Sequence, residues 1–426
     1  GNPKGVMLSH DNIVSNVVAV KKLLPISPGQ RGLSFLPVCH VFERVCLYAY
    51  TYCCVSVTLT GTDNLGGETG DLRTIRPHFF TTVPRLLEKV YEKIVSKGLE
   101  LSGIKRSLFF WALKLADNFE YDQQRGFSEK IKWAIADRLI FSKWREALGG
   151  CVSGIITGAA PCPVKIARVF SAAGIPVREG YGMTESSPGI TINRFTPGHS
   201  HLGTVGQVIS DDIFVKIDAS EGEYRPGEGE ILCKGPNVML GYFNKPEQTA
   251  EVIKMEGNDR WLRTGDIGQL VEAGGVQFLK ITDRKKELLK TSGGKYVAPA
   301  PIEAKLKENF LVEQAMIVGD NMKFVSALIL PAAEPLREWC ERHGHGWTNL
   351  ADAVGKKAVV EHFQAIVDKA NPDFGHAEQV KKFRLVAQPW EAIKSDGTES
   401  ELTPTLKLKR RVILKKFQPE ISSMYD

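Results

Sequence analysis

Side chains suited to ligand chemistry gather in residues 177–185, which read Val-Arg-Glu-Gly-Tyr-Gly-Met-Thr-Glu. An apolar run, residues 174–177, leads into them and predicts a buried strand that ends in a tight loop, where α/β proteins place their ligands. Gly180 and Gly182 would let the backbone approach a flat ligand such as an adenine ring, and Tyr181 offers a ring for stacking. The alternative interpretation is a surface turn that contains glycines by chance.

Two oxygen-bearing side chains close this stretch. Thr184 can donate its hydroxyl to a phosphate oxygen, and Glu185 carries the hard carboxylate oxygens that Mg²⁺ prefers. In a ligand site, Glu185 would therefore be the metal ligand. The residue types of this stretch alone do not distinguish such a site from a surface turn.

Residues 179–185 resemble the Tyr-Gly-x-Thr-Glu core of the adenylate-forming enzymes, the superfamily of acyl-CoA synthetases, luciferases and peptide-synthetase adenylation domains. The resemblance implies catalytic roles for Thr184 and Glu185. It also implies a site for ATP and AMP in which four residues contact the nucleotide: Glu179, Gly180, Tyr181 and Gly182.

The chain opens on Gly-Asn-Pro-Lys-Gly, in which glycines flank Lys4. A loop that grips phosphate needs close backbone N–H groups and a mobile positive charge, although the same residues also make an ordinary turn. The segment resembles the second half of the family's phosphate loop, which implies a catalytic role for Lys4. We expect the first half of that loop to precede Gly1, so that the natural start lies upstream.

A lone histidine, His40, follows a strand predicted at residues 33–36. A histidine beside apolar residues is most often a satisfied core or loop residue. The sequence Leu-Pro-x-x-His-x-Phe-Glu-Arg nevertheless resembles the acyl-site motif of long-chain acyl-CoA synthetases, which implies that His40 flanks the acyl carboxylate. The apolar residues 41–59 would then form the wall of an acyl tunnel, or they are simply core.

Small residues recur at 157–161, Thr-Gly-Ala-Ala-Pro, where a strand is predicted to end. Gly158 and Ala159 leave room for a ligand beside the backbone, and the family's equivalent loop lies beside the acyl group and adenine. Residues 85–148 carry apolar side chains at three- and four-residue steps and predict a long helical segment. This insertion resembles the long-chain fatty-acid branch. Its aromatic residues could contact a membrane or a partner, but core packing is the simpler interpretation.

The sequence pattern changes in residues 201–280. Short runs that alternate between apolar and polar residues, separated by Gly, Pro and Asp, predict a β-rich lobe there. Within the lobe, Thr-Gly-Asp resembles the family's ribose-binding motif and implies that Asp266 accepts the ribose hydroxyls; an Asp in a turn is otherwise a turn former. The charged run that follows resembles the hinge of this fold. It implies that Arg284 reaches the ribose and that Lys286 is the pivot.

Near the C-terminus, Thr-Pro-Thr-Leu-Lys at residues 403–407 resembles the family's final motif, whose lysine bridges the carboxylate and the α-phosphate. This alignment gives the role to Lys407, and Lys409 is the competing candidate. A lysine cluster of this kind otherwise solvates the surface or favours an anionic one. The resemblance places one further loop in the site during thioester formation: Gly293, Gly294 and Lys295.

Composition narrows the class of protein. The chain has 426 residues, 43% of them hydrophobic, which suits a globular protein of two or more domains. A formal net charge of +6 indicates no partner by itself, and we expect no nucleic acid. Eight cysteines without Cys-x-x-Cys spacing predict free thiols in a cytoplasmic protein. No apolar run reaches transmembrane length, although peripheral contact with the inner face of the membrane stays open.

The sequence thus predicts an α/β fold with two domains. The large N-terminal domain, residues 1–282, would hold a helix-covered parallel sheet and a small β-rich lobe, and a hinge would join it to a small α+β C-terminal domain, residues 283–426. The resemblance implies a long-chain fatty-acid–CoA ligase, an acid–thiol ligase that uses ATP, Mg²⁺ and CoA. Two alternatives stay open: transfer of the acyl group to a carrier protein, and an inactive nucleotide-binding or membrane-associating module.

Overall fold

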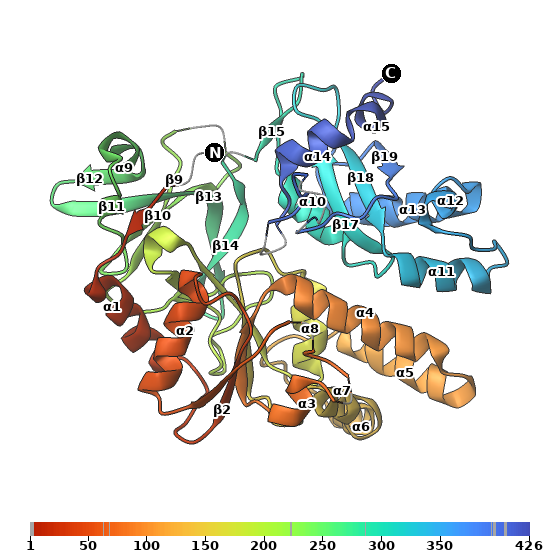
Figure 1. The fold of residues 1–426 in the computed structure, drawn as a ribbon, viewed down its shortest axis with the longest axis horizontal. Coiled ribbons are helices and arrows are strands. Elements are labelled where there is room, and N and C mark those ends of the chain that lie inside the picture. The colour runs from red at the N-terminus through yellow and green to blue at the C-terminus, as the bar shows by residue number, and fades with distance from the viewer. Residues whose placement is uncertain are drawn as a thin grey trace. The chain divides into compact units, whose positions relative to one another are not determined.

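The computed structural model describes residues 4–62, 64–67, 69–221, 224–285, 287–392, 394, 398–403 and 407–426. The chain divides into two compact units (Figure 1). The first comprises Gly1–Leu87 and Lys97–Ile281, and the second comprises Glu88–Ser96 and Thr282–Asp426. The predicted domain boundary after residue 282 lies beside this division.

The first unit is built on a seven-stranded sheet with the strand order β3-β2-β4-β5-β6-β7-β8. The first five strands in this order are parallel, and β7 and β8 continue the sheet antiparallel. The bounds are β2 Arg31–Ser34, β3 Ser56–Leu59, β4 Phe79–Thr82, β5 Gly154–Thr157, β6 Val177–Gly182, β7 Gly189–Ile192 and β8 Gln207–Val208. Every residue of β4 and β5 is buried, as expected for parallel strands that helices cover.

The helices of the first unit begin with α1 (His10–Lys21), which a reciprocal pair of hydrogen bonds between Ser9 and Asn12 caps. The predicted helical stretch from 85 to 148 is not continuous, because it breaks at Leu101 and again after Ala116. The remaining bounds are α2 Val41–Tyr52, α3 Asp71–Ile75, α4 Pro84–Glu100, α5 Gly103–Ala116, α6 Phe127–Ala136, the π-helix η1 Asp137–Phe141, α7 Ser142–Ala147 and α8 Val164–Ala172. The middle of α4, Glu88–Ser96, belongs to the second unit. Four aromatic residues of the stretch 85–148 are buried, as core packing predicts: Tyr91, Phe109, Phe141 and Trp144.

The predicted β-rich lobe forms a second sheet in the first unit, with the order β12-β13-β10-β9 and β14 paired to β13. The bounds are β9 Phe214–Asp218, β10 Gly229–Lys234, β12 Ile253–Glu256, β13 Asp259–Ala273 and β14 Val276–Arg284. Two short strands, β1 (Val6–Met7) and β11 (Gly241–Tyr242), pair antiparallel beside this lobe, and helix α9 (Pro246–Val252) follows β11.

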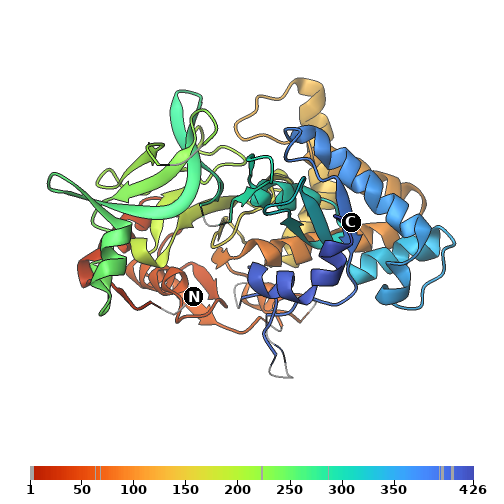
Figure 2. The ribbon, with the colours of Figure 1, turned by 90° about the horizontal axis from the view of Figure 1, so that it is seen from above.

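The second unit places helices on both faces of a three-stranded sheet, β17-β18-β19. Residues alternate along β17: Ala315 and Ile317 enter one core with helices α10, α11 and α13, whereas Met316 and Val318 enter another with α14. Figure 2 shows α13 and α14 on opposite sides of these strands. The bounds are β15 Leu289–Lys290, β16 Tyr296–Val297, α10 Pro299–Leu306, β17 Val312–Val318, β18 Ser326–Pro331, α11 Ala333–Arg342, α12 Leu350–Ala353, α13 Lys357–Ala370, η3 Asn371–Asp373, β19 Lys382–Leu385, α14 Arg410–Lys416 and α15 Gln418–Ser422. The predicted α/β fold, with a β-rich lobe and a smaller α+β unit, is confirmed.

Candidate active site

The central stretch of the sequence is strand β6, and its predicted form needs one correction. The strand does not stop before the glycines but continues to Gly182, because β7 pairs with it antiparallel. A Cβ on Gly182 would lie 1.8 Å from the carbonyl oxygen of Pro188, so the hairpin itself requires this glycine. The nearest atom to a Cβ on Gly180 is 3.6 Å away, so close packing does not require a glycine at that position. The tight turn follows the strand, as the short helix Thr184–Ser186.

Tyr181 joins two motifs that lie far apart in the chain. Its hydroxyl donates a hydrogen bond to Oδ2 of Asp266 at 2.7 Å, and both side chains are buried. Burial, and then the adjacent Asp266 carboxylate, raise the pKa of the Tyr181 phenol well above its ordinary value, so the phenol stays a donor. The ring is part of the buried core, a packing role that the sequence did not predict. The predicted adenine and ribose motifs therefore meet in one place.

Asp266 lies in strand β13 at a bulge, so the interpretation of a simple turn former is wrong. Gly265 has a φ of +72°, which favours glycine, and the pairing of β13 with β10 shifts register at this point. The Thr264 hydroxyl donates to the carbonyl of Ile231 at 2.8 Å and accepts from the backbone N–H of Asp266 at 3.1 Å. The bulge therefore holds the backbone on both sides of Gly265 and aims the Asp266 carboxylate.

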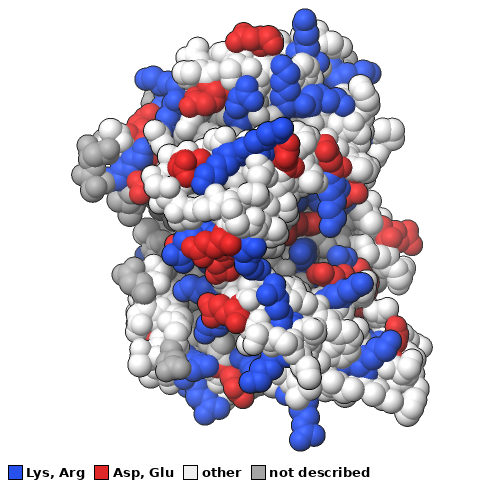
Figure 3. All heavy atoms as spheres, turned by 90° about the vertical axis from the view of Figure 1, so that its right-hand side faces the viewer, with Lys and Arg blue, Asp and Glu red and all other residues white. Residues whose placement is uncertain are grey.

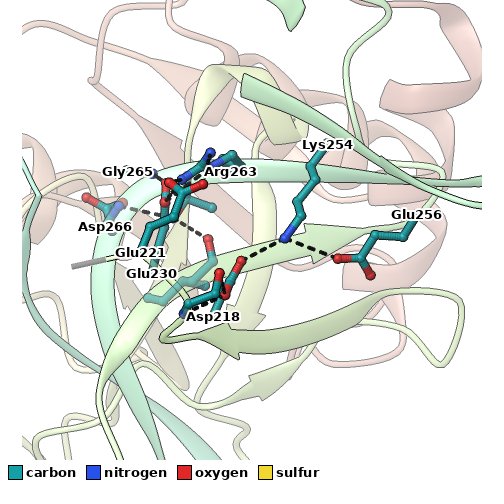
Figure 4. A network of polar contacts seen from close by, with 11 residues as sticks. Asp218, Glu221, Glu230, Lys254, Glu256, Arg263, Gly265 and Asp266 are labelled. Atoms are coloured by element: carbon teal, nitrogen blue, oxygen red, sulfur yellow. Dashed lines mark hydrogen bonds and ion pairs between the residues drawn. The ribbon is translucent and has the colours of Figure 1, made fainter. Parts of the chain in front are cut away.

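A buried carboxylate, Glu230, supports this bulge from β10. Its Oε1 accepts from the backbone N–H of Gly265 at 3.1 Å, and its Oε2 accepts from Arg263 at 2.8 Å (Figure 4). Arg263 also pairs with the more exposed Glu221. Glu230 is thus a positioning residue for Asp266. This role was not predicted, because a single Glu in an alternating strand carries no signal that distinguishes it from a solvent-facing residue.

A second group connects Glu185 with Lys4 through Tyr242. The Tyr242 hydroxyl donates to Oε1 of Glu185 at 2.8 Å, and Nζ of Lys4 lies 4.5 Å from the centroid of the Tyr242 ring. Burial, followed by the hydrogen bond to Glu185, raises the pKa of the Tyr242 phenol. The pairing of β1 with β11 brings these residues together, since Val6 is the partner of Tyr242. Tyr242 was not predicted, because nothing in its sequence neighbourhood points to a carboxylate partner.

From the predicted role of Glu185 as the Mg²⁺ ligand, Tyr242→Phe is expected to raise the KM for Mg·ATP by roughly fivefold, because Glu185 loses a donor worth about 1 kcal/mol while Lys4 keeps its aromatic contact. Pyrophosphate exchange measured against Mg²⁺ concentration checks this. Tyr48→Phe, at a tyrosine that is 44% exposed on α2, is the matched control. An unchanged Mg²⁺ dependence in Tyr242→Phe would show that the hydrogen bond does not tune Glu185.

The ends of β5 and β6 bring four predicted nucleotide residues together. Thr157 is the register partner of Glu179, and a Cβ on Gly158 would lie 3.2 Å from the carbonyl oxygen of Gly180. Ala159 has a φ of +67°, a strained conformation for a residue with a side chain. Strain of this kind is concentrated at ligand sites.

Glu179 carries a perturbed carboxyl at this position. Burial raises its pKa from an ordinary 4.5 to about 8, and a hydrogen bond from the backbone N–H of Cys162 offsets part of that rise. The folded protein therefore holds a proton on Glu179 between pH 4.5 and about 8, where the unfolded chain does not. The contribution of Glu179 to the free energy of unfolding is fully present below pH 4.5 and is lost as the pH rises through about 8.

Glu179→Gln should accordingly remove one pH-dependent part of the stability, since the amide is neutral throughout. Relative to the parent, its free energy of unfolding should rise by up to about 1.4 kcal/mol per pH unit across that window. Urea unfolding followed by tryptophan fluorescence at several pH values measures the difference. Two parallel pH profiles would contradict the raised pKa of Glu179.

His40 lies at the N-terminus of helix α2 as its capping residue and is exposed. The helix is anchored by Glu43, a fully buried carboxylate that accepts from the hydroxyls of Ser34 and, at 2.5 Å, Thr81. Phe42 is near the 157–161 loop, because a Cβ on Gly158 would lie 3.8 Å from its ring. The acyl-site motif and the small-residue loop are therefore neighbours in the first unit.

The apolar residues of α2 serve in packing. Val45 and Ala49 pack against Val17 of α1, and Tyr50 packs against Phe79 of the sheet with ring centroids 6.0 Å apart. These contacts support the core interpretation of the residues that the sequence also allowed to be the wall of a tunnel.

The remaining predicted residues lie in the second unit or beside its boundary, apart from Lys286, which lies outside the described residues. Arg284 ends strand β14. The loop of Gly293, Gly294 and Lys295 is the exposed tip of the β15–β16 hairpin, and Thr291 accepts hydrogen bonds there from the backbone N–H groups of Gly294, at 2.8 Å, and Lys295, at 3.1 Å.

Lys407 and Lys409 differ in their surroundings. Two hydrogen bonds join the backbone of Lys407 to Thr403. The Lys407 N–H donates to the Thr403 hydroxyl at 3.0 Å, and the Thr403 N–H donates to the Lys407 carbonyl at 2.8 Å. The ammonium group of Lys409 donates to the hydroxyl of Ser400 at 2.7 Å, a contact inside the second unit. Lys409 thus has a structural contact inside the second unit, and the assignment of the catalytic role to Lys407 stays a prediction.

Arg410 anchors the segment that carries Lys407. Its guanidinium binds Glu303 at 2.8 Å and Glu287 at 3.1 Å, and Glu287 is the residue after Lys286. Asp283 lies in the same neighbourhood, and burial raises its pKa to about 7. The C-terminal segment is therefore tied to the residues that flank the predicted pivot.

The chain belongs to the AMP-binding enzyme family. Residues 1–243 match the AMP-binding enzyme family, and residues 286–426 match the AMP-binding enzyme C-terminal domain. This membership agrees with the nucleotide motifs that β6, β13 and the β5–α8 loop bring together.

Curated relatives extend the comparison over the whole chain. The long-chain-fatty-acid–CoA ligase FadD15 of Mycobacterium tuberculosis is 32% identical over 432 residues, which cover 100% of this chain and 68% of that protein. Long-chain-fatty-acid–CoA ligase 6 of Homo sapiens is 35% identical over 438 residues, which cover 100% of this chain and 59% of that protein. The chain thus spans about six- to seven-tenths of the length of these relatives.

Solved structures show the same fold. The adenylation domain of a carboxylate reductase from Mycobacterium chelonae has a TM-score of 0.71 at 21% identity, covering 100% of this chain and 58% of that one. The o-succinylbenzoate CoA synthetase of Bacillus subtilis, solved in complex with an acyl-adenylate intermediate, has a TM-score of 0.63 at 20% identity, covering 97% of this chain and 66% of that one.

Proposed function

We propose that this chain carries the ATP-dependent activation of a long-chain fatty acid. The fatty carboxylate attacks the α-phosphorus of ATP to give an acyl-adenylate and pyrophosphate, and the thiol of CoA then displaces AMP to give the thioester. The observation that carries the proposal is the buried hydrogen bond between Tyr181 and Asp266, because it joins the predicted adenine and ribose motifs across 85 residues of chain. The names of the relatives supply the substrate class.

Charge neutralisation around the phosphates is the main demand of the first step, since phosphoryl chemistry asks little covalent help of a protein. Lys4 and Thr184 supply a cation and a hydroxyl, and Lys407 supplies the cation that bridges carboxylate and α-phosphate. Mg²⁺ is commonly held by one or two carboxylates together with substrate phosphates, and Glu185 fits that requirement with hard oxygen atoms. A bound Mg²⁺ would add positive charge to the phosphates of ATP.

The acyl group would enter beside His40 and the loop of Gly158 and Ala159, which the contact between Phe42 and Gly158 makes neighbours. Each methylene that leaves water contributes about 0.8 kcal/mol. A long tail would therefore supply much of the binding energy, which favours long acids over short ones.

The two half-reactions need different surroundings, because adenylation needs Lys407 and thioester formation needs the loop of Gly293, Gly294 and Lys295. Both groups lie in the second unit. A rotation about Lys286 would present them in turn, and Arg284 would meet the ribose. This pivot remains a proposal.

AMP release from ATP and Mg²⁺ tests the proposed function, measured with fatty acids of increasing length, with and without CoA. CoA-dependent release that declines for short acids is the expected result. Pyrophosphate exchange without stimulation by CoA would favour a carrier-protein acceptor instead. Nucleotide binding without any turnover would mean that the chain is a binding module.

We also propose a cytoplasmic location. The eight cysteines are free thiols, which suits a reducing compartment. None of the helices in the described part of the chain is long and apolar enough to cross a membrane.

A further inference from the structure

Helix α6 lies at the edge of the first unit (Figure 1). This helix and the π-helix η1 that follows it expose a row of apolar side chains. The exposed fractions are 83% for Phe127, 47% for Ile131, 44% for Ile135 and 42% for Leu139. These residues recur every four positions, so they share one face of a helix. We name these four residues the α6 stripe. An exposed contiguous row of this kind marks an interaction surface rather than scattered surface hydrophobics.

The opposite face of the same helix is firmly attached to the protein. Ala136, Ile140 and Phe141 are buried, and the Phe141 ring packs against Trp144 with centroids 5.3 Å apart. Trp133 lies under the guanidinium of Arg125, 3.9 Å from its ring. The α6 stripe is therefore the outer face of a rigid helix, whose own core contacts are already made on the inner side.

Basic side chains flank the α6 stripe. Lys130, Lys132 and Arg138 are exposed on the same stretch. The two acidic residues of this stretch make local contacts: Glu129 accepts from the backbone N–H of Gly126 at 3.3 Å, and Asp137 pairs with Arg145 at 2.6 Å. Because the three basic residues outnumber these two acidic ones, the stretch has a net positive charge. On the face of the molecule in Figure 3, Lys and Arg side chains are interspersed with Asp and Glu.

We propose that the α6 stripe lies on an anionic lipid surface, with its apolar side chains below the headgroups and the three basic residues among them. A helix with an apolar face and Lys or Arg beside it is the form that binds in the plane of a membrane interface. The stripe is one convex helix face, which suits a flat, deformable partner. The proposal goes beyond the enzymatic function and does not depend on it.

A second copy of the chain is a poorer occupant. A two-fold contact through the α6 stripe would bring each flanking group, Lys130, Lys132 and Arg138, into the positive field of its symmetry mates. Like charges brought together in this way oppose association. Anionic headgroups would instead attract every one of these side chains.

Vesicle flotation of the full chain tests the proposal, using phosphatidylcholine vesicles with and without phosphatidylglycerol. The parent should bind the anionic vesicles, and binding should weaken with salt. Ile131→Gln/Ile135→Gln and, separately, Lys130→Glu/Lys132→Glu should each lower the partition coefficient at least about tenfold. The control is Ile104→Gln, which removes an apolar side chain 88% exposed at the start of α5, outside the stripe. It should bind as the parent does.

Three results would overturn the proposal. The parent could fail to float with anionic vesicles, or either stripe variant could float as the parent does. The stripe variants could also abolish a concentration-dependent dimer, seen by light scattering, without changing vesicle binding, which would assign the surface to a second copy. Because all five substituted residues are exposed, unchanged circular dichroism and thermal unfolding should accompany every variant.

Discussion

Lys407→Ala is expected to slow acyl-adenylate formation at least about 100-fold, while thioester formation from supplied acyl-adenylate stays within a few-fold of the parent. The reason is that the proposed role of Lys407 is confined to the first step, where its charge bridges two anions as they react. Thioester formation proceeds from an adenylate that already exists. Pyrophosphate exchange and single-turnover thiolysis measure the two steps separately.

Lys409→Ala is the matched control for Lys407→Ala. Its ammonium group donates to Ser400 inside the second unit, so its removal should lower stability modestly and change adenylation little. An equal loss in both half-reactions for Lys407→Ala would contradict its assigned role. A large loss of adenylation in Lys409→Ala alone would transfer that role to Lys409.

Asp266→Ala is expected to weaken AMP binding at least about 30-fold, equivalent to about 2 kcal/mol, because the ribose loses a charged acceptor. The variant should also lose about 1–3 kcal/mol of stability, since the buried Tyr181 hydroxyl loses its acceptor. Isothermal titration with AMP and urea unfolding measure the two effects.

Two further variants separate binding from folding in this pair. Asp266→Asn keeps an acceptor for Tyr181 but removes the charge, so it should weaken AMP binding with a smaller loss of stability. Tyr181→Phe keeps the ring and removes only the donor, so the nucleotide affinity should fall by a few-fold. If Asp266→Ala and Asp266→Asn bound AMP as the parent does, Asp266 would be a structural residue alone.

Asp266→Ala also shows whether the enzymatic proposal and the membrane proposal are independent of each other. Asp266 lies on β13, whereas the α6 stripe lies on a different element of the first unit. Asp266→Ala should therefore still float with anionic vesicles. The stripe variants should in turn bind AMP with parental affinity.

Local sequence patterns predicted which residues could contact a nucleotide and where many of the strands and helices form. The strand predicted before residue 157 is β5, which is buried along its whole length, as expected for a parallel strand that is covered on both faces. The apolar run at residues 174–177 predicted the start of β6, but this strand begins at Val177 and continues through polar residues to Gly182. The alternation around residues 214–217 and 229–234 likewise predicted β9 and β10.

The hydrogen-bond partners of the predicted nucleotide residues follow only from the tertiary structure. The pairs Tyr181–Asp266 and Tyr242–Glu185 join distant parts of the chain, and a hydrogen bond between distant residues leaves no local pattern. The requirement for glycine at position 182 likewise comes from the carbonyl of Pro188 across a hairpin, which only strand pairing brings near. Glu230 has its role for the same reason, since the bulge that it supports exists only once β10 and β13 pair.

Helix α6 shows the same difference, between what local sequence predicts and what the fold decides, at the surface of the protein. Its sequence predicts a helix with apolar residues at regular steps, and core packing was the simpler interpretation of that pattern. Only the folded chain distinguishes Phe127 and Ile131 of α6, which face outward, from Phe141 of η1 and Trp144 of α7, which are buried. The period of a helix determines which residues share a face, whereas the neighbours that the fold supplies determine whether that face is covered.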